Sequence, residues 1–167
     1  CRLGRVLDVA SGDGALASLV APRAERLTCF DVSPKVVAAG KRRLAHLAHV
    51  QFVQGDMHAL PFEAEAFDAV MMMNCLTYAE DPKRALSEAS RVLVVGGALT
   101  GVTLKRHRNG RAVEAYGHVN RGFEPESLAA DLEGAGFRVD GCAVTSREQR
   151  QPHFEVITFH ATRKNEP

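Results

Sequence analysis

The feature that most constrains the fold of this chain is a regular alternation of short apolar segments with segments of helical composition. Five strand-like runs are apolar enough to be covered on both faces of a sheet. They occupy residues 5–10, 26–32, 50–54, 67–74 and 96–104. Helix-like segments follow three of them, at 14–21, 33–48 and 81–93. Strands and helices that alternate with short connections predict an α/β fold, with a mostly parallel sheet and helices on both faces.

Local signals mark two of the helix boundaries. The first helix-like segment stops at Pro22, because proline cannot continue a helix. Ser33 and Pro34 make a favourable start for the second helix, with the serine as N-cap and the proline in the first helical position. These signals support the alternation that the apolar runs indicate.

The last third of the chain has a different character. Residues 105–122 are polar and are expected to be irregular. A helix is expected at 124–136, ending at glycine, and it is followed by strands at 138–146 and 154–162. Because little sequence separates these two strands, they predict an antiparallel, hairpin-like end to the sheet.

Composition and charge exclude several classes of protein. The 167 residues are 46% hydrophobic and 25% charged, which predicts a single compact domain over residues 1–167. The formal net charge of +1 gives no whole-molecule reason to bind nucleic acid or an anionic membrane. No apolar run approaches the roughly 20 residues of a bilayer-spanning helix, and no signal peptide opens the chain, so we expect a cytoplasmic protein with no membrane partner. Because a strand begins almost directly after Cys1, we also expect that a leading helix or domain is missing.

Cysteine and histidine spacing gives no sign of a metal centre. The four cysteines, Cys1, Cys29, Cys75 and Cys142, lie far apart and form no C-x-x-C pair. We interpret them as lone buried thiols in a reducing compartment. The seven histidines show no H-x-x-x-H spacing and no accompanying carboxylate cluster, so no metal site is predicted.

The stretch VLDVASGDGA, at 6–15, leads a strand into a glycine turn that a helix follows. Ligands of open parallel sheets bind beyond the carboxyl ends of the strands, where this turn lies. Gly12 and Gly14 allow the main chain to turn sharply and to approach a ligand, and the following helix offers free N–H groups. Taken alone, such a turn is as often purely structural as it is part of a ligand site.

Polar residues at the ends of three other strands narrow the choice of ligand. Asp31 ends the second strand, where a carboxylate can accept two hydrogen bonds from a ribose diol. Asp56 follows the third strand, and NCLTY follows the buried run of the fourth. A dinucleotide fingerprint would need glycine where this chain has Ala10 and Ala15, so a nicotinamide oxidoreductase is disfavoured.

With these motifs the chain resembles the class I S-adenosylmethionine-dependent methyltransferases, close to the small-molecule branch typified by ubiquinone and menaquinone biosynthesis enzymes. LDVASGDGALA resembles the first motif of the family, FDVSP the acidic end of the second strand, and VQGDMHALPF the adenine-binding segment. Residues 67–99 resemble the segment through the fourth and fifth strands. The resemblance implies a Rossmann-like three-layer sandwich with a mostly parallel seven-stranded sheet and an antiparallel C-terminal strand. Ala10 replaces the usual first glycine, from which we expect weaker or slightly shifted cofactor binding.

The resemblance also implies S-adenosyl-L-methionine as cofactor, S-adenosyl-L-homocysteine as product and a small-molecule methyl acceptor. Gly12 and Gly14 would cradle the methionyl part, Asp31 would hold both ribose hydroxyls, and Asp56 would accept from the adenine amino group. Leu60 would join the apolar wall beside the adenine, and a buried acid in the first strand would orient the glycine turn. The full set of implied cofactor-binding residues is Asp8, Ala10, Ser11, Gly12, Gly14, Asp31, Val32, Ser33, Asp56, Met57 and Asn74.

Members of this family share no universal catalytic residue, so the catalytic residues stay unknown. Weak candidates are Asn74 and Tyr78 after the fourth strand and the loop residue His118. NCLT does not match the N-P-P-Y type motif of amino-group methyltransferases that act on nucleic acid or protein. The basic run KRHRNGR, at 105–111, is interpreted as a solvated loop, with contact to an acidic substrate or nucleic acid as the alternative.

One competing interpretation of the function stays open. Residues 116–139 resemble the methyltransferase-like domain of bacterial regulators that carry an arsenical-resistance-repressor-type winged helix. That resemblance implies a sensor of S-adenosylmethionine or S-adenosylhomocysteine, with nucleic acid as partner only through an absent N-terminal DNA-binding domain. We favour an enzyme, which should keep a cavity beside the methyl position. Oligomeric state and the identity of the acceptor are not predicted.

Overall fold

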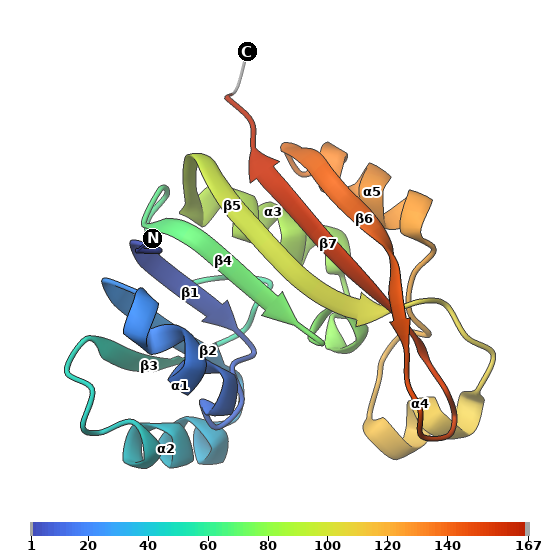
Figure 1. Ribbon diagram of the computed structural model, residues 1–167, viewed down its shortest axis with the longest axis horizontal. Helices are drawn as coiled ribbons and strands as arrows, with labels where there is room; N and C mark the ends of the chain where they lie inside the picture. The colour runs from blue at the N-terminus through green and yellow to red at the C-terminus, as the bar shows by residue number, and fades with distance from the viewer. Residues whose placement is uncertain (1, 166–167) are drawn as a thin grey trace.

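The computed structural model describes residues 2–165, in which seven strands form one sheet in the order β3-β2-β1-β4-β5-β7-β6 (Figure 1). The strands are β1 (Arg5–Val9), β2 (Arg26–Asp31), β3 (Val50–Gln54), β4 (Phe67–Met73), β5 (Leu93–Leu104), β6 (Phe137–Arg147) and β7 (Glu155–Arg163). Neighbouring strands from β3 to β5 are parallel, whereas β7 is antiparallel to both β5 and β6. The predicted sheet, with its antiparallel C-terminal strand and final hairpin, is confirmed.

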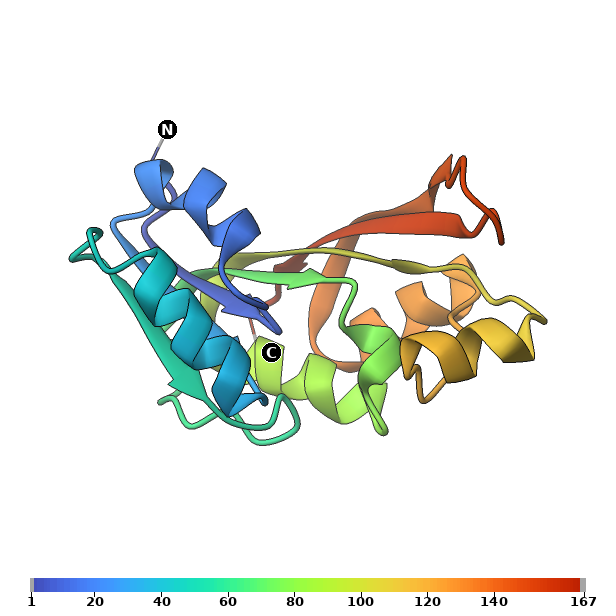
Figure 2. The same cartoon turned by 90° about the horizontal axis from the view of Figure 1, so that it is seen from below.

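Helices cover both faces of the sheet, which gives the three layers expected of the fold (Figure 2). The helices are α1 (Ala15–Val20), α2 (Pro34–Arg43), α3 (Pro82–Val92), α4 (Gly110–Tyr116) and α5 (Pro125–Gly134), with 3-10 turns η1 (Ala21–Arg23) and η2 (Leu76–Tyr78). Along β1, Val6 packs in the core with α1 and α2, while Leu7 and Val9 pack with α3 and α5. No helix in residues 2–165 combines the length and hydrophobicity that crossing a bilayer requires.

Helices α2 and α3, which lie on opposite faces of the sheet, each begin after a residue whose side chain caps the helix. Ser33 Oγ accepts a hydrogen bond from the Val36 N–H at 3.4 Å and starts α2, as its sequence predicts. Asp81 Oδ1 accepts from the Arg84 N–H at 3.0 Å and starts α3. These caps satisfy backbone donors that have no partner inside the helix. They also fix where each helix begins relative to the strand end that precedes it.

The structure corrects three predictions, two of which concern boundaries of elements. Helix α2 ends at Arg43 and not at residue 48, because the chain then turns through hydrogen bonds of the Leu47 and Val50 N–H groups to the carbonyls of Leu44 and Leu47. Strand β5 starts at Leu93, since this residue already pairs with β4 across an irregularity in the register.

The third correction concerns residues 105–122, which are not irregular throughout because they contain α4. Asn109 caps this helix by accepting a hydrogen bond from the Ala112 N–H at 3.1 Å, and Gly117 ends it with φ of +67°. Ala112 is buried in a small cluster with Leu104 and Phe154. A polar segment therefore folds as a helix because distant residues bury its one apolar side.

The cysteines that the structure describes are free thiols. Cys29 and Cys75 are buried and Cys142 is half-buried, whereas Cys1 lies outside the described residues. Burial raises the pKa of the Cys29 and Cys75 thiols to about 12. Both groups are therefore protonated and poorly nucleophilic at neutral pH.

Candidate functional site

A cavity of about 510 Å³ opens where β1, β2, β3 and β4 end. It is lined by Ala10, Phe30, Asp31, Val32, Gly55, Asp56, Met57, His58, Asn74, Tyr78 and Glu80. All of these lining residues are predicted from the sequence except Phe30, Gly55, His58 and Glu80. Because the carboxyl ends of parallel strands meet at one edge of a sheet, residues from four separate motifs come together here.

A larger hollow of about 650 Å³ lies at the other edge, beside the amino ends of the strands. Several of its polar side chains already have partners within the protein. Arg5 pairs with Asp68 at 3.0 Å, and His49 Nε2 lies 2.9 Å from the carbonyl oxygen of Ala21. The smaller cavity at the carboxyl edge is therefore the better candidate for a ligand site.

Two residues of the cavity wall have left-handed backbone conformations. Ala10 follows β1 with φ of +57°, and Asn74 follows β4 with φ of +55°. This region disfavours residues with a Cβ by about 1–2 kcal/mol, although asparagine tolerates it better than most. The strain lies at the ends of two adjacent strands, where the chain must turn sharply and leave backbone atoms exposed to the cavity.

Asp31 joins the glycine turn to the end of β2. Its Oδ2 accepts a hydrogen bond from the Gly12 N–H at 3.1 Å, and its Oδ1 accepts from the Ser33 N–H at 2.9 Å. The Ser11 N–H also donates to the Phe30 carbonyl at 3.0 Å. Each carboxylate oxygen has a second lone pair, so Asp31 can still accept two hydroxyl groups from a ligand in the cavity.

The two glycines of the turn have different roles. Gly12 has φ of +59°, and a Cβ at this position would meet no atom within 4 Å. Gly14 has φ of +82°, and its Cβ would lie 3.0 Å from Phe52 Cζ and 3.1 Å from Leu44 Cδ1. Gly12 thus leaves open space at the turn, whereas Gly14 permits close packing against Leu44, which follows α2, and against Phe52 of β3.

Some of the implied cofactor residues do not line the cavity. These are Asp8, Ser11, Gly12, Gly14 and Ser33. Asp8 is 1% exposed, and its Oδ2 has no hydrogen-bond partner within residues 2–165. Burial, with a smaller effect of the Asp31 charge, raises the pKa of Asp8 to about 7. That oxygen makes no hydrogen bond to the glycine turn, which Asp8 was expected to orient.

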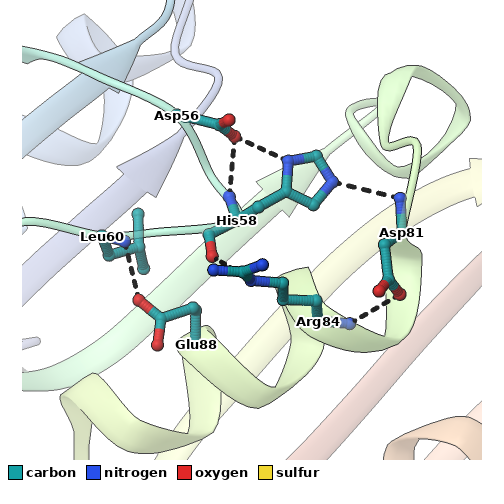
Figure 3. A network of polar contacts seen from close by, with 6 residues as sticks. All are labelled: Asp56, His58, Leu60, Asp81, Arg84 and Glu88. Atoms are coloured by element: carbon teal, nitrogen blue, oxygen red, sulfur yellow. Dashed lines mark hydrogen bonds and ion pairs between the residues drawn. The ribbon is translucent and has the colours of Figure 1, made fainter.

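His58 holds the carboxylate of Asp56 in a fixed position (Figure 3). Asp56 Oδ1 accepts from the His58 N–H at 2.8 Å and lies 2.6 Å from His58 Nδ1. His58 Nε2 accepts from the Asp81 N–H at 3.2 Å, so the proton of the neutral ring lies on Nδ1 and is donated to Asp56. The backbone N–H of His58, followed by its ring, lowers the pKa of Asp56 below its ordinary value.

Helix α3 anchors the loop that carries these residues (Figure 3). Arg84 Nε donates to the His58 carbonyl at 2.8 Å, and Glu88 Oε2 accepts from the Leu60 N–H at 2.7 Å. Leu60 was predicted to join the apolar wall of the cavity, but it is 5% exposed, belongs to the core and does not line the cavity. Val32 is 68% exposed and does line it.

A second cavity, of about 170 Å³, shares Asn74 and Tyr78 with the first. Its other lining residues are Thr77, Leu104, Tyr116, His118, Glu148 and Phe154. The ring of His118 contacts Tyr78 edge-on at 5.0 Å between centroids and stacks on Tyr116 at 5.7 Å. Burial lowers the pKa of His118. All three weak catalytic candidates thus line the second cavity, and two of them, Asn74 and Tyr78, also line the first.

A Rossmann-like sheet in this strand order, with an acid at the end of β2 beside a glycine turn, defines a class I S-adenosylmethionine-dependent methyltransferase fold. A model of the methyltransferase domain family matches residues 7–100. The chain therefore belongs to the methyltransferase domain family.

Similar proteins agree with this assignment. Demethylmenaquinone methyltransferase of Clavibacter sepedonicus is 36% identical over 95 residues, which cover 57% of this chain and 39% of that protein. The chain thus spans about two fifths of the length of that relative. A candidate methyltransferase from Bacillus halodurans superposes with a TM-score of 0.81 at 22% identity, over 96% of this chain and 93% of its own. N-methyltransferase NodS of Bradyrhizobium japonicum, in complex with S-adenosyl-l-homocysteine, has a TM-score of 0.79 at 20% identity, over 98% and 80%. At these identities the two solved structures establish the fold alone.

Proposed function

We propose that this protein transfers the methyl group of S-adenosyl-L-methionine to a small-molecule acceptor and releases S-adenosyl-L-homocysteine. The observation that carries the proposal is the pair of adjoining cavities that share Asn74 and Tyr78. The larger has the size and the acidic residues that a nucleoside needs, and the smaller offers a place for an acceptor beside it.

The residues of the larger cavity fit the adenosyl part of the cofactor. Asp31 has one free lone pair on each oxygen for the two ribose hydroxyls. Asp56 binds His58 through Oδ1 alone, which leaves Oδ2 for the adenine amino group. Val32 supplies an exposed apolar wall, and the Met57 N–H is the proposed donor to the adenine ring.

The residues around the strained strand ends fit the amino acid part. The backbone carbonyls of Ala10 and Asn74 are the proposed acceptors for its ammonium group. Gly12 offers open space for close approach of the main chain, since nothing lies within 4 Å of a Cβ there. The glycine turn is held to Asp31, so the ribose and amino acid positions are fixed relative to each other.

When bound, the sulfonium ion supplies an electrophilic methyl group. The protein's main contribution is to hold the acceptor in line with it, and positioning of this kind can supply roughly 7–11 kcal/mol in favourable systems. Asn74 and Tyr78 stand at the shared wall where this alignment must be set. His118 has a lowered pKa and lies in the smaller cavity, so its neutral ring is available to take a proton from an acceptor that arrives protonated.

The sensor alternative finds no support in the comparisons. The two functions can be separated by turnover. We expect labelled methyl groups to pass from S-adenosyl-L-methionine to at least one member of a panel of small phenols, quinones, amines and thiols. Tight calorimetric binding of S-adenosyl-L-homocysteine with no transfer to any panel member would favour a sensor, and binding of NAD alone would overturn the cofactor assignment.

A further inference from the structure

A third cavity, of about 390 Å³, adjoins the second one at Phe154, which lines both. It lies where the segment after β5 meets the β6–β7 hairpin, at the same end of the molecule as α4 (Figure 1). Its lining residues are Lys105, Arg106, His107, Arg108, Asn109, Arg147, Pro152, His153, Phe154 and Glu155. We call it the basic cavity, because four of these residues are lysine or arginine and only one is acidic.

The positive charge of the basic cavity is largely uncompensated. Its single acid, Glu155, is already paired with Lys105 at 3.2 Å. Arg106 and Arg108 make no ion pair within residues 2–165, and the Arg147 guanidinium donates to the carbonyl of His153 at 3.3 Å. A chain with a net charge of only +1 thus gathers three guanidinium groups without carboxylate partners around one hollow. Guanidinium groups bind carboxylates and phosphates particularly well.

Aromatic rings connect the basic cavity to the cofactor cavity. Tyr78 contacts His118 at 5.0 Å between ring centroids, and His118 stacks on Tyr116 at 5.7 Å. Tyr116 contacts Phe154 at 6.3 Å, and Phe154 contacts His107 at 4.5 Å. These contacts form a continuous path of rings, which we call the aromatic path, from the wall shared with the cofactor cavity to the basic cavity. A ligand that lies along the aromatic path would contact ring surfaces near the cofactor cavity and positive charge at its other end, in the basic cavity.

His107 is a further unusual feature of the basic cavity. Both of its ring nitrogens are buried and lack a hydrogen-bond partner within the described part of the chain. Burial, together with the charges of His118 and Arg121, lowers the pKa of His107. A buried ring whose two nitrogens both lack hydrogen-bond partners is energetically costly.

We propose that the methyl acceptor carries an anionic group, a carboxylate or a phosphate, which binds Arg106, Arg108 and Arg147 in the basic cavity. An apolar or aromatic part of the acceptor lies along the aromatic path and places the nucleophile beside Tyr78. The inference rests on the proposed function and adds a substrate class to it. It also assigns a role to the basic run at 105–111, for which the sequence alone favours a solvated loop and leaves contact with an acidic substrate or nucleic acid as the alternative.

Direct binding tests the basic cavity without knowledge of the acceptor. The probes are phenyl phosphate, benzoate and neutral benzamide, titrated into the protein in the presence of saturating S-adenosyl-L-homocysteine. The test variant is Arg106→Gln/Arg108→Gln/Arg147→Gln. The control is Lys41→Gln/Arg42→Gln, which removes exposed charges at the end of α2. We expect an anionic probe to bind the wild type and the control, with affinity at least tenfold lower in the test variant and no detectable binding of benzamide.

The outcomes separate the two proposals. If phenyl phosphate binds more tightly than benzoate, the anion is a phosphate, and the reverse order indicates a carboxylate. Equal binding of an anionic probe to wild type and test variant, or binding of a single-stranded oligonucleotide but of neither small anion, overturns the anionic acceptor. Binding of S-adenosyl-L-homocysteine is measured in parallel. If the wild type does not bind S-adenosyl-L-homocysteine, the proposed function itself is wrong. We expect the affinity for S-adenosyl-L-homocysteine to be the same in the test variant as in the wild type, and this result would show that the test variant is folded.

Discussion

The carboxylate of Asp31 accepts the backbone N–H of Gly12 at 3.1 Å and so ties the end of β2 to the turn after β1. This contact fixes the position of the acid that we propose as the ribose ligand. It also means that a substitution at Asp31 removes both a ligand contact and a support of the turn.

We expect Asp31→Ala to weaken the binding of S-adenosyl-L-homocysteine by roughly 100-fold, because two hydrogen bonds to a charged group are lost. Isothermal titration calorimetry measures the change. Asp13→Ala is the matched control, since Asp13 lies in the same turn but pairs with Arg43 at the exposed surface. Equal affinities of Asp31→Ala and wild type would contradict the assignment.

The strain at Ala10 predicts an unusual response to glycine. The left-handed backbone conformation costs a residue with a Cβ about 1–2 kcal/mol, and glycine removes this strain. The greater conformational freedom of glycine in the unfolded chain offsets about 0.4–1 kcal/mol of that gain. We therefore expect Ala10→Gly to raise the free energy of unfolding by roughly 0.5–1 kcal/mol and to leave cofactor affinity equal or tighter. Urea denaturation provides the measurement. Ala15→Gly, at the start of α1, should lower stability instead, and a decrease in both variants would refute the role of strain.

The contact between His58 and Asp56 makes His58 a positioning residue for the proposed adenine ligand. His58→Ala removes one hydrogen bond to the carboxylate, so we expect the Kd of S-adenosyl-L-homocysteine to rise by roughly 2–10-fold. His46→Ala changes an exposed histidine outside the cavity and should have no effect. His58→Asn, which can donate to Asp56 from its amide, should recover part of the affinity. Absence of any difference between the alanine variants at positions 58 and 46 would remove His58 from the site.

Asp8 should make stability depend on pH. Its pKa is raised to about 7 in the folded chain, mainly by burial, whereas an unfolded chain has a value of about 3.9. Because the folded chain keeps this proton to higher pH, the contribution of Asp8 to the free energy of unfolding is greatest below pH 4 and declines as the pH rises to about 7. At about 1.4 kcal/mol per pKa unit, the decline amounts to roughly 4 kcal/mol.

The Asp8→Asn variant isolates this effect, because its side chain does not titrate. The difference in unfolding free energy between wild type and Asp8→Asn should change in favour of the variant between about pH 4 and pH 7. Urea titrations at several pH values measure the difference. A difference that stays constant across this window would show that Asp8 does not hold its proton in the folded chain.

Most of the fold could be predicted from short-range signals in the sequence. Apolar runs predicted five of the seven strands, and the pattern after residue 136 predicted the last two. Ser33 with Pro34 predicted the start of α2, because capping acts over a few residues. Asp31 and Asp56 could be assigned to one cavity from the sequence, because each follows a predicted strand and a parallel sheet brings the carboxyl ends of its strands to one edge. The helix in the polar segment escaped prediction, because its buried contacts come from β5 and from Phe154, which is far along the chain.

The sequence by itself thus determined the α/β class, the strand ends and the acids that stand there. Only the tertiary structure decided that His58 fixes Asp56, that Gly14 serves packing, and that Leu60 belongs to the core. It alone brought Tyr78, Tyr116 and Phe154 together along one path of rings. These features depend on contacts between residues distant in sequence, and no local pattern of side chains encodes such contacts.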